Sequence, residues 1–79
     1  MKVQVYVTVK KGILDPQGEA VRSALERLGY NGVNEVRVGK LIELDLETDE
    51  AETARPAVHA MCTELLANSV IEDFDIKIP

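Results

Sequence analysis

The chain has 79 residues, with 14 acidic and nine basic side chains and a net charge of −5. A chain of this length forms a single domain, residues 1–79, and has no room for a second core. The acidic balance argues against nucleic acid and anionic membrane surfaces as partners, and no apolar run reaches the roughly 18 residues of a membrane span. A domain this small is marginally stable and has one cysteine, Cys62, so no disulfide can form within the chain. We therefore expect a cytoplasmic protein that self-associates or has a stable partner.

In the first part of the chain, apolar and polar residues alternate as in a strand, and the apolar residues then recur at the spacing of a helix. Residues 3–9 place four valines on one face, which predicts a half-buried strand. Asp15 is suited to cap a helix and Pro16 to be its first residue, and an apolar stripe at helical spacing continues to Leu28. Gly29 predicts a left-handed end to this helix.

Gly18 lies in the first turn of that helix, where a glycine costs about 1 kcal/mol relative to alanine. This cost indicates a close approach of another group, and the neighbouring Gln17 offers hydrogen-bonding groups at the start of the helix. One alternative is a plain dimeric domain whose special residues serve only folding. That alternative predicts that Gly18→Ala stabilises the protein by up to about 1 kcal/mol.

Residues 33–47 return to a period of two and are interrupted at Gly39. A hairpin with a three-residue loop, residues 39–41, keeps both faces consistent and pairs Arg37 with Glu43. A single long strand bent at Gly39 preserves the same alternation, and both readings remain open.

A second helical region begins near residues 48–50, where Asp49 and Glu52 have the spacing of a capping box. Pro56 predicts a frayed or kinked first turn, so the start of this helix stays open. Asn68 suits the end of the helix, and residues 70–78 alternate as a last strand.

The resulting order is βαββαβ, which predicts an α+β protein with an antiparallel sheet and both helices on its apolar face. RNA-recognition modules share this order, but their open sheet face carries stacking aromatic residues. Here Tyr6 is the only aromatic residue expected on that face, among several acids. We therefore expect no nucleic-acid binding.

Residues able to perform catalysis are scarce. His59 is the only histidine, and Cys62 falls on the apolar stripe of the second helix, where a buried thiol is expected. We find no phosphate-binding loop, no nucleophile triad and no metal-spaced carboxylates. The sequence predicts no catalytic residue and no metal site.

A set of polar or conformationally special residues remains at the ends of the expected elements, where binding residues are often found. Each has a simpler explanation by itself, such as pairing of Arg37 with Glu43, but together they form our candidate partner-binding site. The set consists of Asp15, Gln17, Gly18, Arg37, Gly39, Lys40, Asn68 and Glu72.

Four stretches resemble the PurS family in order and spacing. They are GILDPQGEAV (12–21), ALERLGY (24–30), VRVGKLIEL (36–44) and CTELLANSVIEDF (62–74). The combination of LDPQG, VRxGK and LLANxVIE is specific, and the least similar stretch is residues 47–57.

The resemblance implies a non-catalytic subunit of phosphoribosylformylglycinamidine synthase, a ligase complex of purine (IMP) biosynthesis. In this family a PurS homodimer or homotetramer bridges the glutaminase subunit, PurQ, and the synthetase subunit, PurL, and assists ammonia transfer. ATP and Mg would be used by PurL, and this chain would bind no cofactor. The candidate residues would then dock on one of these partners. The alternative from another class is an ACT-like domain that binds a small regulatory molecule.

Overall fold

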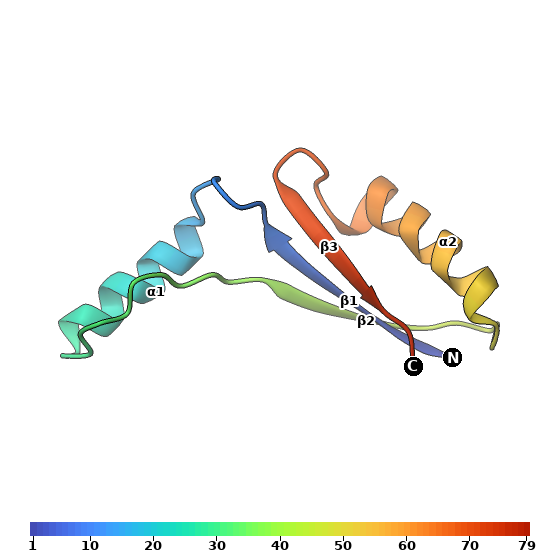
Figure 1. The fold of residues 1–79 in the computed structure, drawn as a ribbon, viewed down its shortest axis with the longest axis horizontal. Helices are drawn as coiled ribbons and strands as arrows, with labels where there is room; N and C mark the ends of the chain where they lie inside the picture. The colour runs from blue at the N-terminus through green and yellow to red at the C-terminus, as the bar shows by residue number, and fades with distance from the viewer.

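The computed structural model describes all residues from 1 to 79, as three strands and two helices followed by a π-helical turn (Figure 1). The elements are β1 (Lys2–Val9), α1 (Pro16–Arg27), β2 (Lys40–Asp45), α2 (Ala51–Met61), η1 (Cys62–Leu66) and β3 (Glu72–Lys77). Both neighbours of β1 run antiparallel to it, in the order β2-β1-β3. The predicted α+β class with an antiparallel sheet and two helices is confirmed. Neither helix is long and apolar enough to cross a membrane.

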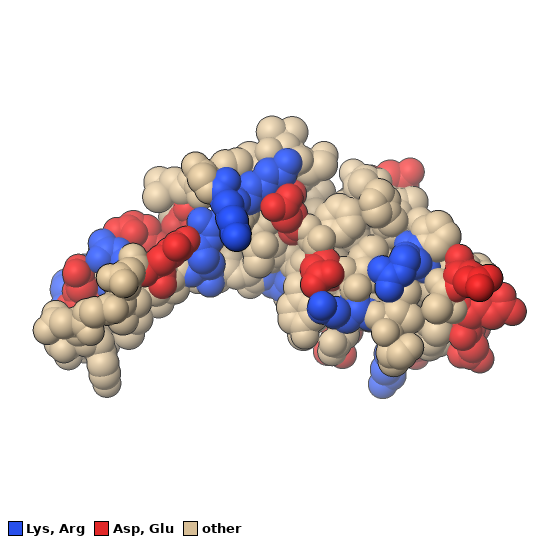
Figure 2. Space-filling model, in the orientation of Figure 1, with Lys and Arg blue, Asp and Glu red and all other residues tan.

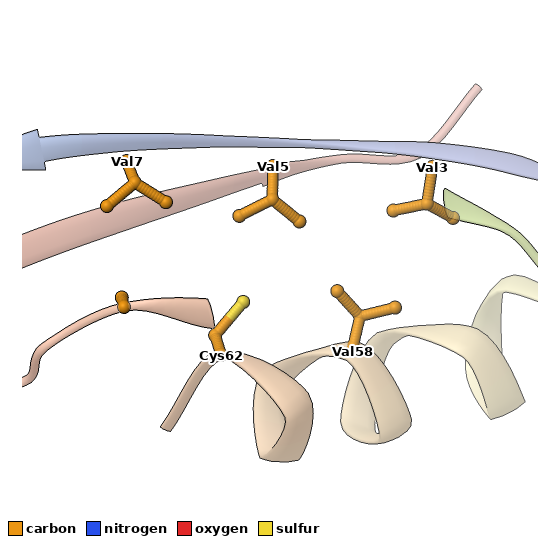
Figure 3. Close-up of a cluster of buried hydrophobic side chains, with 6 residues drawn as sticks. Val3, Val5, Val7, Val58 and Cys62 are labelled. Atoms are coloured by element: carbon orange, nitrogen blue, oxygen red, sulfur yellow. The ribbon is translucent and has the colours of Figure 1, made fainter. Parts of the chain in front are cut away.

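The alternation of β1 creates the core. Val3, Val5 and Val7 are essentially inaccessible to solvent and face Val58 and Cys62 of the helical layer (Figure 3). The cross-strand partners Leu44, Ile42, Ile76 and Phe74 are also apolar, because antiparallel partners point to the same face of the sheet, whereas the β2 partner of Val7 is Lys40 at the end of the pairing. The central strand therefore supplies one side of the core and the α2–η1 segment supplies the other.

The second helix differs from its expected boundaries. It begins at Ala51, and the preceding Glu50 makes no side-chain capping bond, so the predicted capping box is wrong. The helix continues through Pro56. It then widens into η1, where the amide of Ala67 donates to the carbonyl of Cys62 at 3.0 Å. The helical segment ends at Ala67, whose backbone is extended, one residue before the predicted Asn68.

The first helix has its expected ends but not its expected position. Asp15 is its N-cap, and Gly29 has φ +97 just after its last turn. The amide of Tyr30 donates to Leu25 and that of Gly29 to Glu26, so a Schellman motif closes the helix.

The prediction that both helices cover the apolar face is wrong for α1. Only α2 lies over the sheet, whereas α1 projects beyond the end of β1 (Figure 1). The chain is elongated, 48 × 24 × 15 Å, with a radius of gyration of 15.9 Å. A compact chain of this length would have about 12 Å. The physical reason is local: hydrogen bonds and close contacts at the start of α1 join it to residues 36–38 instead of to the sheet.

Of the two alternatives that the sequence left open at Gly39, the hairpin does not occur. Residues 33–39 run beside α1 as an extended segment that leads into β2 (Figure 1). Their backbone groups form no hydrogen bond with another backbone group of the chain. The other alternative, a chain that continues through Gly39 without turning back, matches the course of the backbone. Only residues 40–45 of this stretch form a strand in this chain. We call residues 16–39, which comprise α1 and this extended segment, the arm.

Candidate functional site

The candidate residues gather near one end of the sheet. Because the sheet is antiparallel, β1 ends where β2 and β3 begin, so Lys40 lies opposite Val7 and Glu72 lies opposite Val9. The loop after β1 leads directly into α1, which brings Asp15 to the same end. Topology thus collects residues that are far apart in the sequence.

Asp15 holds the arm together. Its side chain is almost buried, with 6% of the residue exposed. One carboxylate oxygen accepts the amide of Gly18 at 3.0 Å, and the other accepts the amide of Val38 at 2.8 Å. These two hydrogen bonds, with a smaller contribution from the nearby Arg37 charge, hold the pKa of Asp15 below its usual value. The carboxylate therefore links the start of α1 to the extended segment.

Gly18 permits that link. A Cβ added at this position would lie 1.9 Å from the carbonyl oxygen of Val36, which no side chain can do without moving the backbone. The predicted close approach is therefore present. The structure also favours the opposite sign for Gly18→Ala from that expected of a plain helix start, because the substitution would push α1 away from residues 36–38.

Gly39 has the same role where the arm meets the sheet. A Cβ there would lie 2.5 Å from the carbonyl oxygen of Val7. The absence of a side chain lets the extended segment pass close to β1 as it becomes β2.

Arg37 binds the loop after β1. Its guanidinium donates to the carbonyls of Val9, Lys10 (3.0 Å) and Ile13 (3.4 Å), and it lies 3.5 Å from Glu35. The pairing of Arg37 with Glu43 expected from a hairpin does not occur. A planar guanidinium has five N–H donors spread over a rigid fork, so it reaches separated carbonyls more readily than the compact ammonium of a lysine. Arg37 thus fixes the loop that precedes α1.

Asn68 and Glu72 organise the turn between η1 and β3. The Glu72 carboxylate accepts the amide of Asn68 at 2.7 Å, and the Asn68 side-chain oxygen accepts the amide of Val70 at 3.1 Å. The carbonyl of Asn68 accepts the amides of Ile71 and Glu72. The turn lies beside the loop after β1, because the amide of Lys10 donates to Ile71 at 2.8 Å.

The candidate residues therefore divide into two groups. Gln17 and Lys40 are exposed and their side chains make no hydrogen bond within the chain, so they are available to a partner. The side chains of Asp15, Arg37, Asn68 and Glu72 are hydrogen-bonded within the chain. The glycines allow close backbone contacts.

Several exposed apolar side chains near this site were missed by the sequence reasoning. Leu14 is 72% exposed, Val70 77% and Leu65 82%. Leu14 falls outside the periodic segments, and an aliphatic residue in a loop was the signal that could have found it. Val70 was expected to begin the last strand, but β3 begins only at Glu72.

Catalytic groups do not come together here. No three side chains of the His, Cys, Asp and Glu types are arranged to hold a metal ion. Burial raises the pKa of the Cys62 thiol, which disfavours the nucleophilic thiolate. His59 is exposed on α2, with its ring edge-on to Phe74 at 5.4 Å.

The fold and site define a small α+β protein with a three-stranded antiparallel sheet and a projecting arm. Residues 2–79 match the PurS family, described as phosphoribosylformylglycinamidine (FGAM) synthase. The PurS subunit of Synechocystis is 49% identical over 95% of this chain and 75% of its own length. That of Bacillus subtilis is 47% identical over 98% and 90%. The chain therefore belongs to the PurS family.

Solved structures agree with this assignment. Bacillus subtilis PurS has a TM-score of 0.85 and 48% identity, covering 96% of this chain and 94% of that one. A chain in the structure of PurLQS from Thermotoga maritima has a TM-score of 0.84 and 34% identity, covering 96% and 93%. The resemblance seen in the sequence is confirmed, and the ACT-like alternative has no support in these matches.

Proposed function

We propose that this chain is a non-catalytic subunit of phosphoribosylformylglycinamidine synthase in purine biosynthesis, which bridges the glutaminase and synthetase subunits in the cytoplasm and assists ammonia transfer. The observation that carries the proposal is the similarity over 96% of the chain to a protein of the Thermotoga maritima PurLQS structure. ATP and Mg would be bound by the synthetase subunit, PurL, and glutamine by the glutaminase subunit, PurQ.

Self-association through the arm is part of the proposal. The backbone of residues 33–39 has no backbone partner within the chain, and unpaired strand edges readily bind another strand. On α1, the apolar stripe is incompletely covered, with Val21 42% and Leu28 74% exposed. A second copy would supply both a neighbouring strand and an apolar surface, giving a homodimer.

Sedimentation velocity of a variant pair tests this self-association. Leu28→Glu places a charge on the apolar stripe and is expected to shift the protein toward monomer. Arg27→Glu, on the same helix but off the stripe, serves as the control and should leave the assembly unchanged. A wild-type monomer at micromolar concentration, or an unchanged assembly in Leu28→Glu, would contradict the proposed dimer.

The eight candidate residues enter the proposal in two roles. We assign Gln17 and Lys40 to direct contact with a partner, since their side chains are exposed. The other six would shape the surface around them: Asp15, Gly18, Arg37, Gly39, Asn68 and Glu72.

Co-purification with the synthetase and glutaminase subunits, in the presence of glutamine and Mg-ADP, tests the bridging function. Turnover is then measured with glutamine and with ammonia as the nitrogen source, with and without this chain. We expect the omission of the chain to abolish glutamine-dependent turnover and to spare ammonia-dependent turnover. Absence of a complex, together with unchanged glutamine-dependent turnover, would refute the function.

A further inference from the structure

The arm is a rigid unit that touches the rest of the chain at few points. The Asp15 carboxylate accepts the amides of both Gly18 and Val38, so α1 and its extended segment are held together. The helix makes no extensive contact with any strand. The arm meets the sheet only at its junction, where Arg37 binds the loop after β1 and Gly39 passes close to that strand. A unit with so few contacts is able to turn as one body.

Two segments that contain glycine connect the arm to the sheet. Gly12, in the loop after β1, has φ +85 and open space where a Cβ would lie. Gly39 stands where the extended segment becomes β2. Because glycine adopts dihedral angles that other residues avoid, both connections are suited to a change of direction.

The arm carries apolar surface that its own chain leaves in water. On the stripe of α1, Val21 is 42% exposed and Leu28 74%, and Tyr30, just beyond the helix, is 62% exposed. Figure 2 shows charged side chains along the upper side of the arm and uncharged atoms at its lower end. The backbone of residues 33–39 also lacks a backbone partner. The arm therefore has both an apolar face and a strand edge without partners.

The sheet has a matching uncovered area beside α2. This helix lies toward β3, where the ring of His59 is edge-on to that of Phe74 at 5.4 Å. The core valines of β1 are inaccessible to solvent, whereas the apolar residues that follow Leu41 on the β2 side are only partly buried. These residues are Ile42, Leu44 and Leu46. The outer edge of β2 pairs with no strand. An apolar strip and a free strand edge therefore lie side by side.

The arm fits this area when the chain turns back at residues 39–41. A three-residue loop there pairs Val38 with Ile42, which keeps the apolar residues on the core face. The next pair is Arg37 with Glu43, which are oppositely charged. The lengths also agree, since the 12 residues of α1 span about 18 Å and a strand of six residues spans about 20 Å. In this arrangement α1 connects β1 to a parallel strand on the far side of β2, as in a split βαβ unit.

We infer that the arm closes onto its own sheet when the chain is alone, so that residues 33–38 pair with the outer edge of β2 and α1 lies beside α2. Closure exchanges the hydrogen bonds between Arg37 and the loop after β1 for a strand ladder and an ion pair with Glu43. It also covers the apolar stripe of α1.

Closure and self-association use the same surfaces. A second copy is able to supply an identical arm to the same area, as in domain swapping. The closed form therefore withdraws the surfaces that the proposed dimer needs, and the concentration of the chain decides between the two forms. The inference rests on the proposed self-association for the open form only, because closure concerns the chain by itself.

Single-molecule energy transfer tests closure in the full chain. Donor and acceptor dyes are attached at Asn31→Cys, at the tip of the arm, and at Glu52→Cys, at the start of α2; both positions are exposed, whereas Cys62 is buried. The two positions lie near opposite ends of the open chain, which is 48 Å long. The closed arm brings them to the same end of the sheet. The labelled chain is refolded by dilution from denaturant to picomolar concentration, where it cannot associate.

We expect a population with high energy transfer at this dilution. Prolonged incubation with unlabelled chain at micromolar concentration should convert it to low transfer. A narrow population with low transfer at picomolar concentration would mean that the arm stays open, and a broad one that the arm is disordered; either result overturns the inference. The labelling control is the wild type, whose buried Cys62 should take up no dye.

A second test lengthens the connection at Gly39. Insertion of Asn-Gly between Gly39 and Lys40 supplies a pair that favours a tight turn, and longer connecting loops disfavour domain swapping. We expect a monomer in sedimentation velocity. Its radius of gyration, measured by small-angle scattering, should fall from 15.9 Å toward the roughly 12 Å of a compact chain.

The matched control is the same insertion between Gly32 and Val33, which should associate as the wild type does. An insertion at Gly39 that leaves a monomer with a radius of gyration near 15.9 Å, or that unfolds the chain, would contradict closure.

The outcomes separate closure from the proposed function. A wild type that does not associate at micromolar concentration but shows high transfer at dilution contradicts the proposed dimer and supports closure. A wild type that joins the synthetase and glutaminase subunits but shows low transfer at dilution overturns closure alone.

Discussion

Replacing Gly18 by alanine tests the central contact of the arm. The new Cβ would lie 1.9 Å from the Val36 carbonyl oxygen and 2.8 Å from its carbon. Since a carbon and a carbonyl oxygen normally approach no closer than about 3.3 Å, the extended segment must move by about 1.4 Å. Such a movement also lengthens the hydrogen bond from Val38 to Asp15, which is 2.8 Å long.

The magnitude follows from two opposing effects. Overpacking usually costs about 1–3 kcal/mol of stability. We expect a cost of about 3 kcal/mol here, because the clash is with two backbone atoms, which cannot rotate away as a side chain could. Alanine recovers about 1 kcal/mol of helix propensity. The net expectation is a loss of about 2 kcal/mol, or a fall in melting temperature of roughly 10 °C for a domain of this size.

Thermal and urea unfolding, followed by circular dichroism at a fixed protein concentration, measures this loss. The control is Gln17→Ala, the exposed neighbour in the same helical turn, which should stay within about 0.5 kcal/mol of the wild type. A Gly18→Ala variant that is as stable as the wild type, or more stable, would refute the reasoning and restore the interpretation of Gly18 as part of a plain helix start.

Three further predictions concern other parts of the structure. Asp15→Asn should lose stability at neutral pH, since an amide nitrogen cannot accept the Val38 amide. Folding lowers the pKa of Asp15, so the carboxylate stabilises the folded state at pH values above its ordinary pKa of 3.8, and this stabilisation is lost at lower pH. The difference in unfolding free energy between the wild type and Asp15→Asn should therefore shrink below pH 3.8. Arg37→Lys should speed hydrogen exchange of the Ile13 amide, because the compact ammonium lacks the planar fork with which the guanidinium reaches carbonyls of Val9, Lys10 and Ile13; unchanged exchange would refute that role. Val58→Ala should cost about 2 kcal/mol, from the transfer of two buried carbon groups plus a cavity, whereas Leu65→Ala at an exposed position should cost less than about 0.5 kcal/mol.

Local patterns in the sequence were sufficient wherever neighbours in the chain decide the structure. The alternation of residues 3–9 led to the central strand, because a strand with one buried face must alternate. Asp15 and Gly29 marked the ends of α1, because caps are made by residues within a few positions. The family resemblance rested on short motifs of the same kind.

Patterns of this kind could not decide how α1 meets the rest of the chain. The stripe that ends at Leu28 shows that the helix has an apolar face, but not whether the sheet of the same chain covers it. Similarly, the alternation of residues 33–39 fits a hairpin and an extended segment equally well, because both place the same side chains on the same face.

The sequence by itself determined the central strand, both ends of α1 and the presence of a polar set at element ends, because each depends on local spacing. The tertiary structure alone decided that Arg37 binds the carbonyls of a distant loop and that Asp15 joins α1 to Val38. It also decided that Leu14 and Val70 remain in solvent. These features depend on which segments the antiparallel sheet brings to the same end, and that arrangement is set by long-range pairing, which leaves no periodic signal in the chain.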